Sequence, residues 1–289
     1  MIIDTHLHVW DLDRSPYSWL GPHVPQWNRT FTFDEVAPQL EENGVDAVIL
    51  VQADDDDRDT ELMLEVAAER PEVVGVVAYI PLERPAEAAA RLEVLQANPY
   101  VVGIRNLTHD RADPDWVLRP DVDETLGLIE QAGLPWDHVA VLPRHLEHVA
   151  RIGERHPELR IVIDHLAKPP IGEAAVEPWW SLIGVAAQNP LVYAKISGLY
   201  PGADPASWTV DGLRPFVDRT LDVFGASRLM YGGDWPISLP AGGYGRIFHG
   251  LKATLAHQSR NDTDQSWWGA TACQVYGISA ETYQQPRNP

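Results

Sequence analysis

The sequence alternates short apolar runs with longer amphipathic segments along nearly its whole length. The apolar runs are rich in β-branched residues, which favour strands, and the segments between them have the period of a surface helix. Strands that alternate with helices in this way form a parallel sheet, because each strand needs a crossover before its parallel neighbour. We expect strands at residues 2–8, 45–51, 73–80, 100–106, 134–142, 159–165, 191–196 and 228–233.

Helices are expected between these strands and after the last one. They should cover residues 34–43, 59–70, 85–98, 121–132, 144–156, 179–188, 211–224, 244–258 and 264–276. Eight strand–helix units fit a closed (β/α)8 (TIM) barrel of the α/β class, which usually takes about 250 residues. We therefore predict one domain over residues 1–289. An open doubly wound sheet is the alternative, but the first strand lacks the glycine-rich phosphate turn typical of that fold.

The charge balance excludes two classes of partner. The net charge is −20, and only Lys168, Lys195 and Lys252 are lysines. A chain this acidic is repelled by nucleic acid and by anionic membranes, so we expect neither as a partner. No apolar run approaches the ~18 residues that a membrane helix needs. A small-molecule substrate is the expected partner, and a homo-oligomer stays open.

Two further features bear on the compartment. Cys273 is the single cysteine, so it cannot form an internal disulfide, and this favours a reducing compartment. The first predicted strand begins at the second residue, so no targeting segment is expected before it. We expect a cytoplasmic protein.

The first predicted strand carries a histidine pair. Side chains alternate along a strand, so Asp4, His6 and His8 are expected on one face. Two imidazoles two residues apart can bind the same cation, and imidazole suits zinc and similar metals. Two unrelated strand histidines are the alternative interpretation, but the preceding aspartate and the polar residues that end the other strands favour a site.

Polar residues also end several other strands. In a barrel, the carboxyl ends of the strands converge on one rim. The residues expected there are His6, His8, Gln52, Arg105, His165, Lys195 and Asp234. Each has a structural alternative: an ion pair for Arg105 or Lys195, a hydrogen-bonded core position for His165, a capping role for Asp234. Their convergence on one rim favours a functional site over seven separate structural roles.

Several segments of the chain resemble a known family almost from end to end. They are Asp4-Thr5-His6-Leu7-His8-Val9-Trp10-Asp11, Val51-Gln52-Ala53, Val102-Gly103-Ile104-Arg105, Ile163-Asp164-His165-Leu166-Ala167-Lys168-Pro169, Lys195-Ile196-Ser197-Gly198-Leu199, Gly232-Gly233-Asp234-Trp235-Pro236 and Gly269-Ala270-Thr271-Ala272. Together they are similar to the amidohydrolase superfamily, in its amidohydrolase-2 branch. That branch includes sugar-acid lactonases similar to L-fuconolactonase and L-rhamnonolactonase, and a metal-independent pyrone-dicarboxylate lactonase.

The resemblance implies a hydrolase of carbohydrate metabolism that opens the lactone ring of a small sugar acid. It implies either one divalent metal ion, with zinc as the first choice, or no metal. The ligands of the metal ion would be His6, His8 and Asp234. Asp234 would be the general base, and His165 and Arg105 would stabilise the oxyanion or hold the substrate. Substrate contacts are expected from Arg105, Gln52, Lys195, Trp235 and Trp10.

The chain departs from the family pattern at several positions. Gly233 replaces the usual serine, and Asn106 follows Arg105 where fuconolactonase-like proteins often have histidine. Arg105 also stands where two-metal relatives have a bridging lysine, and His138 lies too early in the fifth strand to reach the rim. We therefore expect no binuclear site. The alternatives are non-oxidative decarboxylation of an aromatic or dicarboxylic acid, metal-independent hydrolysis of a pyrone-type dicarboxylate lactone, and a non-catalytic binding barrel.

Overall fold

The computed structural model describes residues 1–200, 208–256 and 265–279. Each strand pairs in parallel with the next one, from β1 to β8 in chain order. The strands are β1 (Ile3–Leu7), β2 (Ala47–Val51), β3 (Val73–Ala78), β4 (Val101–Asn106), β5 (Trp136–His138), β6 (Ile161–Ile163), β7 (Val192–Ile196) and β8 (Leu229–Tyr231).

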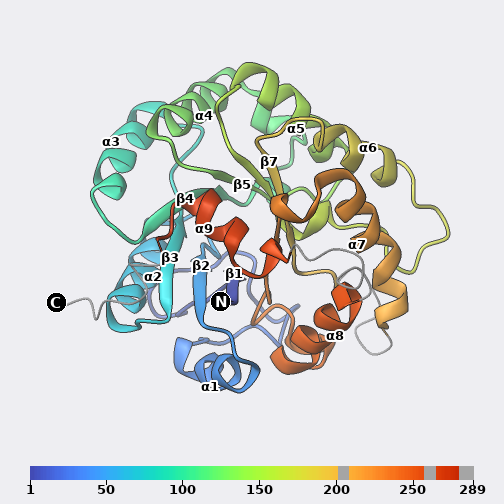
Figure 1. Ribbon diagram of the computed structural model, residues 1–289. Helices are drawn as coiled ribbons and strands as arrows, with labels where there is room; N and C mark the ends of the chain where they lie inside the picture. The colour runs from blue at the N-terminus through green and yellow to red at the C-terminus, as the bar shows by residue number, and fades with distance from the viewer. Residues whose placement is uncertain (201–207, 257–264, 280–289) are drawn as a thin grey trace.

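Helices follow the strands and surround them, as Figure 1 shows. They are α1 (Phe33–Asn43), α2 (Asp57–Glu69), α3 (Pro85–Gln96), α4 (Pro120–Ala132), α5 (Pro143–Arg155), α6 (Trp179–Ala186), α7 (Val210–Phe224), α8 (Tyr244–Ala256) and α9 (Ala270–Tyr276). In the described part of the chain, no helix combines the length and apolarity needed to span a bilayer.

The sheet closes beyond the end of β8. The backbone N–H of Asp234 donates to the carbonyl oxygen of His6 at 2.7 Å, and that of His8 donates to the carbonyl oxygen of Trp235 at 2.8 Å. These two bonds join the end of the last strand to the first strand. The predicted (β/α)8 barrel is confirmed, and its closure brings the histidine pair beside Asp234.

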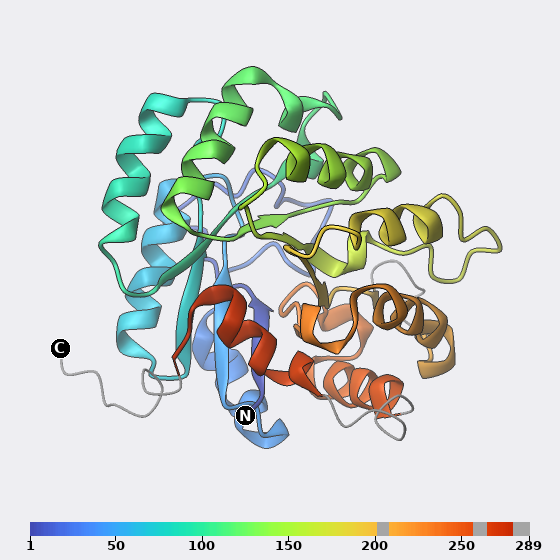
Figure 2. The same cartoon turned by 45° about the horizontal axis from the view of Figure 1, so that its top comes forward.

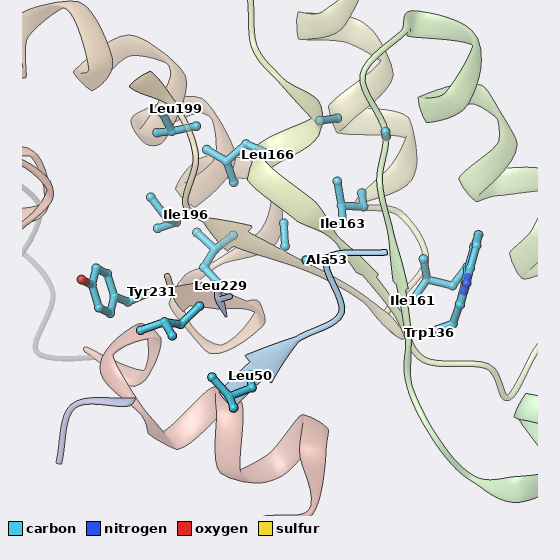
Figure 3. Packing of buried hydrophobic residues seen from close by; sticks show 14 of the residues in the cluster. Leu50, Ala53, Trp136, Ile161, Ile163, Leu166, Ile196, Leu199, Leu229 and Tyr231 are labelled. Carbon is cyan, nitrogen blue, oxygen red and sulfur yellow. The ribbon is translucent and has the colours of Figure 1, made fainter. Parts of the chain in front are cut away.

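Two apolar layers hold the barrel. The outer layer lies between strands and helices, and Figure 3 shows part of it, including Leu50, Ile163 and Leu229. The inner layer fills the barrel, where Ile3 and Val77 join Val275 and Tyr276 of α9. In both ribbon views α9 lies across the strands near the N-terminus (Figures 1 and 2). Helix α9 therefore closes the amino-terminal end of the barrel, and the carboxyl ends of the strands stay accessible for a site.

All the strands are shorter than the sequence predicts, and β5 and β6 differ most from their predicted ranges. Beyond β5 the chain leaves the sheet, because Pro143 begins the next helix and the predicted residues 139–142 form the connection to it. Beyond β6 the chain cannot stay extended, because His165 has a left-handed φ of 54°. The closing helix predicted at 264–276 is split at Gly269, and its first residue, like residues 257–258 of the helix before it, lies outside the described residues.

Candidate active site

Two imidazoles and one carboxylate meet at the carboxyl end of β1. Oδ1 of Asp234 lies 3.5 Å from Nε2 of His8 and 3.8 Å from Nε2 of His6. The two rings stand edge to face with their centroids 4.8 Å apart, and all three side chains are buried. The arrangement predicted from the strand ends is present.

The backbone around Asp234 needs glycine. A Cβ at Gly233 would lie 2.5 Å from Oδ2 of Asp4 and 2.6 Å from Cε2 of Tyr244. A serine at this position, the residue usual in the family pattern, would therefore displace these neighbours. The next residue, Asp234, has a left-handed φ of 54°, which is uncommon outside glycine and concentrates at functional sites.

Asp4 does not join the two histidines. The register of β1 shifts between Asp4 and Leu7, so the simple alternation expected from the sequence is interrupted. The Asp4 carboxylate instead accepts hydrogen bonds from the backbone N–H of Gly233 at 2.9 Å and from the hydroxyl of Tyr244 at 2.8 Å. Burial raises its pKa to about 6. Asp4 therefore anchors the turn that carries Asp234.

The histidine nitrogens are arranged as metal ligands require. Nδ1 of His8 lies 2.7 Å from the carbonyl oxygen of Val51, which only accepts, so Nδ1 carries the proton and Nε2 keeps its lone pair. Nε2 of His6 and Oδ2 of Asp234 are buried and have no hydrogen-bond partner among the described residues. The ligand atoms of these three residues lie within 4.8 Å of one another. They fit one divalent ion, and the donor set suits zinc.

A cavity of about 230 Å³ opens beside this cluster. Its walls come from Arg105 of β4 and from the segments after β1, β2, β4, β5, β6 and β8, and they include two tryptophans from the segment after β1. The lining residues are His8, Trp10, Trp19, Ala53, Arg105, Leu107, His109, Val139, Val141, His165, Lys168, Asp234 and Ile237. The predicted residues His8, Trp10, Arg105, His165 and Asp234 therefore share one small-molecule cavity.

Arg105 and His165 are held by residues at the carboxyl ends of other strands. Nη1 of Arg105 donates to the carbonyl oxygen of Gln52 at 2.9 Å, and its Nε lies 3.1 Å from Oδ2 of Asp164. Nδ1 of His165 lies 2.9 Å from Oγ of Ser197 and 4.0 Å from Oδ2 of Asp234. Burial holds the pKa of His165 well below its ordinary value, so its ring is neutral at neutral pH.

Three expected substrate contacts do not line the cavity. Gln52 is buried and its amide nitrogen donates to Asp55 at 2.8 Å. Trp235 is buried and packs edge to face on Phe31 at 5.5 Å. Lys195 is fully buried, with Nζ 2.5 Å from Oδ2 of Asp137. None of these three side chains lines the cavity. They support the site indirectly, through the residues that they contact.

His138 does not line the cavity, but the predicted reason is wrong: His138 is the last residue of β5 and not an early one. Its Nε2 lies 3.0 Å from the carbonyl oxygen of His145, and its ring stacks on Trp136. Arg105 occupies the end of β4 where two-metal relatives have lysine. No histidine from β5 therefore reaches the cavity.

Sequence reasoning missed two charged residues of the site. Lys168 lines the cavity, and its Nζ donates to the carbonyl oxygen of Gly198 at 2.9 Å. The available signal was its place just after a strand, as one of three lysines in an acidic chain. Asp164 is fully buried with Oδ1 3.3 Å from Nδ1 of His6. Nothing in its sequence context separates it from an ordinary strand-end aspartate.

Known proteins share both the sequence and the fold. The amidohydrolase family profile matches residues 3–277. L-fucono-1,5-lactonase of Burkholderia ambifaria is 36% identical over 290 residues, which cover 98% of each chain. L-fucono-1,5-lactonase of Burkholderia multivorans is 28% identical over 96% of each chain. A solved amidohydrolase of Burkholderia multivorans with bound zinc superposes with a TM-score of 0.87 at 27% identity, over 96% of this chain and 100% of that one. The chain belongs to the amidohydrolase family and is a hydrolase.

Proposed function

We propose that the chain hydrolyses the lactone ring of a small sugar acid, of the L-fucono-1,5-lactone type, and so acts in carbohydrate metabolism. One observation carries this proposal: the Asp234 carboxylate is buried between two histidines, faces the cavity, and has an Oδ2 without a hydrogen-bond partner in the described structure. The lactonases with which the chain shares 36% and 28% identity support this substrate class.

Lactone hydrolysis needs a base for the attacking water and an acid for the leaving alcohol. Oδ2 of Asp234 is free to take a proton from a water in the cavity. The same carboxyl group can return that proton to the ring oxygen as the C–O bond breaks. A single buried carboxylate thus serves both steps, as expected for a cyclic ester whose leaving group stays attached.

Cationic and neutral donors surround the place where negative charge develops. Arg105 and Lys168 line the cavity from β4 and from the turn after β6, and neutral His165 lines it with Nδ1 4.0 Å from Oδ2 of Asp234. Their N–H groups are fixed by the protein before substrate binds, so they can stabilise the oxyanion without reorganisation. A divalent ion held by His6, His8 and Asp234 would add polarisation of the carbonyl and a lowered pKa of water.

Two tryptophans supply a surface for the sugar ring. Nε1 of Trp10 donates to the carbonyl oxygen of Arg29 at 2.6 Å, and Nε1 of Trp19 donates to that of Ala53 at 2.8 Å. Both rings line the cavity and stand edge to face at 5.3 Å. With their polar atoms already bonded, the rings present apolar surface to the C–H groups of a sugar lactone.

A second candidate is a lactone that itself carries carboxylates, such as a pyrone dicarboxylate. It is favoured by the charges of the cavity, where Arg105 and Lys168 are cations and Asp234 is the one carboxylate among the described lining residues. Decarboxylation of an aromatic acid lacks such support, because His138 is turned away from the cavity.

A substrate panel tests the proposal. Acid release is measured from aldonolactones, beginning with L-fucono-1,5-lactone, and from pyrone dicarboxylate, and carbon dioxide release is measured from hydroxybenzoates. We expect acid release from an aldonolactone that depends on Asp234. Turnover of pyrone dicarboxylate alone would favour the second candidate, and carbon dioxide release alone would overturn both.

A further inference from the structure

Asp164 is a fully buried acid that the proposed reaction does not use. It follows β6 directly and precedes His165. Its Oδ1 lies 3.3 Å from Nδ1 of His6 and 3.4 Å from Nζ of Lys195. Its Oδ2 lies 3.1 Å from Nε of Arg105. Asp164 therefore connects the histidine pair to two cations that belong to different strands.

The cations around Asp164 are part of a compensated buried cluster. Nζ of Lys195 also lies 2.5 Å from Oδ2 of Asp137, which accepts a hydrogen bond from the hydroxyl of Tyr276. Two carboxylates thus face one ammonium and one guanidinium. Buried charges persist when each is paired, and loss of one partner leaves the others uncompensated. Arg105 pairs with the Asp164 oxygen that does not face His6, and Lys195 pairs with the oxygen that does.

The position of the His6 proton follows from its two ring nitrogens. A proton on Nε2 would be a buried donor without a partner at hydrogen-bond distance, since Oδ1 of Asp234 is 3.8 Å away. A proton on Nδ1 would point toward Oδ1 of Asp164, 3.3 Å away, and this carboxylate oxygen only accepts and has no hydrogen-bond partner among the described residues. In the competing arrangement, Lys195 donates to Nδ1 of His6 at 3.3 Å. The Nδ1–H form places the proton toward the nearer of the two carboxylate oxygens, at 3.3 Å rather than 3.8 Å, and gives His6 the same proton placement as His8.

We propose that Asp164 is a positioning residue that holds His6 with its proton on Nδ1 and directs the Nε2 lone pair at Asp234. Lys195 and Arg105 hold both Asp164 oxygens, so the second group with metal-binding geometry, His6, Asp164 and His165, does not take a cation of its own. The role of His6 as a metal ligand rests on the proposed function. The position of the His6 proton does not, because it exists without metal or substrate.

Nitrogen NMR of the full-length protein decides the proton position. The protein is labelled with ¹⁵N-histidine and kept free of added metal at neutral pH, and His6→Gln assigns the His6 signals. We expect a protonated Nδ1 and an unprotonated Nε2. Asp164→Asn keeps an oxygen acceptor and should keep this form, whereas Asp164→Ala should lose it. Asp137→Asn is the matched control, because it removes a charge from the same cluster without touching His6. A wild-type His6 protonated on Nε2 would overturn the proposal even if Asp164→Ala fails to fold.

Zinc binding gives a second readout that does not involve activity. Competition with a chromogenic chelator should show one zinc per chain in the wild type and an affinity about 10–100-fold weaker in Asp164→Ala, the usual effect of losing a ligand's hydrogen-bond partner. A second zinc that is lost in Asp164→Asn would make Asp164 a ligand and contradict the proposal. If the wild type binds no zinc, the metal part of the proposed function fails, and the NMR result alone decides the role of Asp164.

Discussion

The backbone N–H of Asp234 donates a hydrogen bond of 2.7 Å to the carbonyl oxygen of His6. Together with the hydrogen bond from the N–H of His8 to Trp235, this contact closes the barrel and sets the Asp234 carboxylate beside the histidine pair. The two residues are far apart in sequence, and only closure of the sheet brings them together. The geometry of the site is therefore tied to the integrity of the β8–β1 junction.

Gly233→Ala tests that junction. The new Cβ would lie 2.5 Å from Oδ2 of Asp4, so the turn must shift. Overpacking of this kind typically costs about 1–3 kcal/mol. We expect lower stability toward urea and at least tenfold lower turnover, because Asp234 moves with the turn. Gly212→Ala is the control, because its new Cβ would meet only Oγ1 of Thr209 at 3.4 Å. This variant should leave stability and turnover unchanged, or raise stability slightly. An unchanged Gly233→Ala protein would contradict the tight fit.

Lys168→Met tests the cation that lines the cavity. The variant keeps most of the side-chain volume and removes the cavity-lining charge that, in the proposed function, stabilises the oxyanion. Loss of one such donor typically lowers turnover about 10²–10³-fold. Lys252→Met, on the exposed surface of α8, is the matched control. Steady-state kinetics on an accepted lactone measures both, and a Lys168→Met turnover within about twofold of wild type would remove Lys168 from the mechanism.

Trp19→Ala tests the aromatic wall. In the proposed function, Trp19 packs on the sugar ring equally before and during the reaction, so its removal should raise KM about tenfold and change kcat little. Trp180→Ala, in α6 and remote from the cavity, should leave KM unchanged. A fall in kcat with unchanged KM would assign Trp19 a role in the chemical step.

Asp59 makes stability depend on pH. It is fully buried, and burial raises its pKa from 3.8 to about 7, while it accepts hydrogen bonds from Ala53 N–H and the Tyr17 hydroxyl. Because the folded state keeps a proton that the unfolded state releases above pH 3.8, this contribution is fully present at low pH and is lost as pH rises toward 7. Between pH 5 and pH 8 the loss is on the order of 3 kcal/mol.

The Asp59→Asn variant isolates this contribution. The new amide can accept a hydrogen bond from the N–H of Ala53 and donate one to the hydroxyl of Tyr17, so the variant should fold. Because an amide does not titrate, the pH-dependent contribution of this position to stability is removed. Urea unfolding of both proteins at pH 5 and pH 8 is the measurement. We expect Asp59→Asn to lose less stability than wild type across this range. Equal losses in the two proteins would show that Asp59 does not titrate there.

The fold could be predicted from the sequence, because a short apolar run followed by an amphipathic helical segment recurs in every strand–helix unit. The sequence was also sufficient for His6, His8 and Asp234, since each ends a strand and parallel strands end at one rim. It could not predict the register shift in β1, because a one-residue slip depends on pairing with β2 and β8. Asp4 was therefore placed on the wrong face.

The sequence also could not predict how far below the rim of the barrel a strand-end side chain is buried. Lys195 lies near the end of its strand, but its ammonium is fixed below the cavity by Asp137, a residue whose role depends on packing against Tyr276. Lys168 reaches the cavity because residues 165–168 all have left-handed φ values. A run of non-glycine residues in this conformation has no sequence signal, because tertiary contacts impose it.

The turnover of Asp234→Asn tests the central claim most directly. The change keeps the shape of the side chain and removes the charge that accepts the proton, and Asp222→Asn, exposed on α7, is the matched control. General-base catalysis typically contributes about 10²–10⁴-fold. With the fold verified by circular dichroism, we expect Asp234→Asn to hydrolyse an accepted lactone at least 10²-fold more slowly than wild type and Asp222→Asn to match it. An Asp234→Asn turnover within about tenfold of wild type would contradict the assignment of Asp234 as the base.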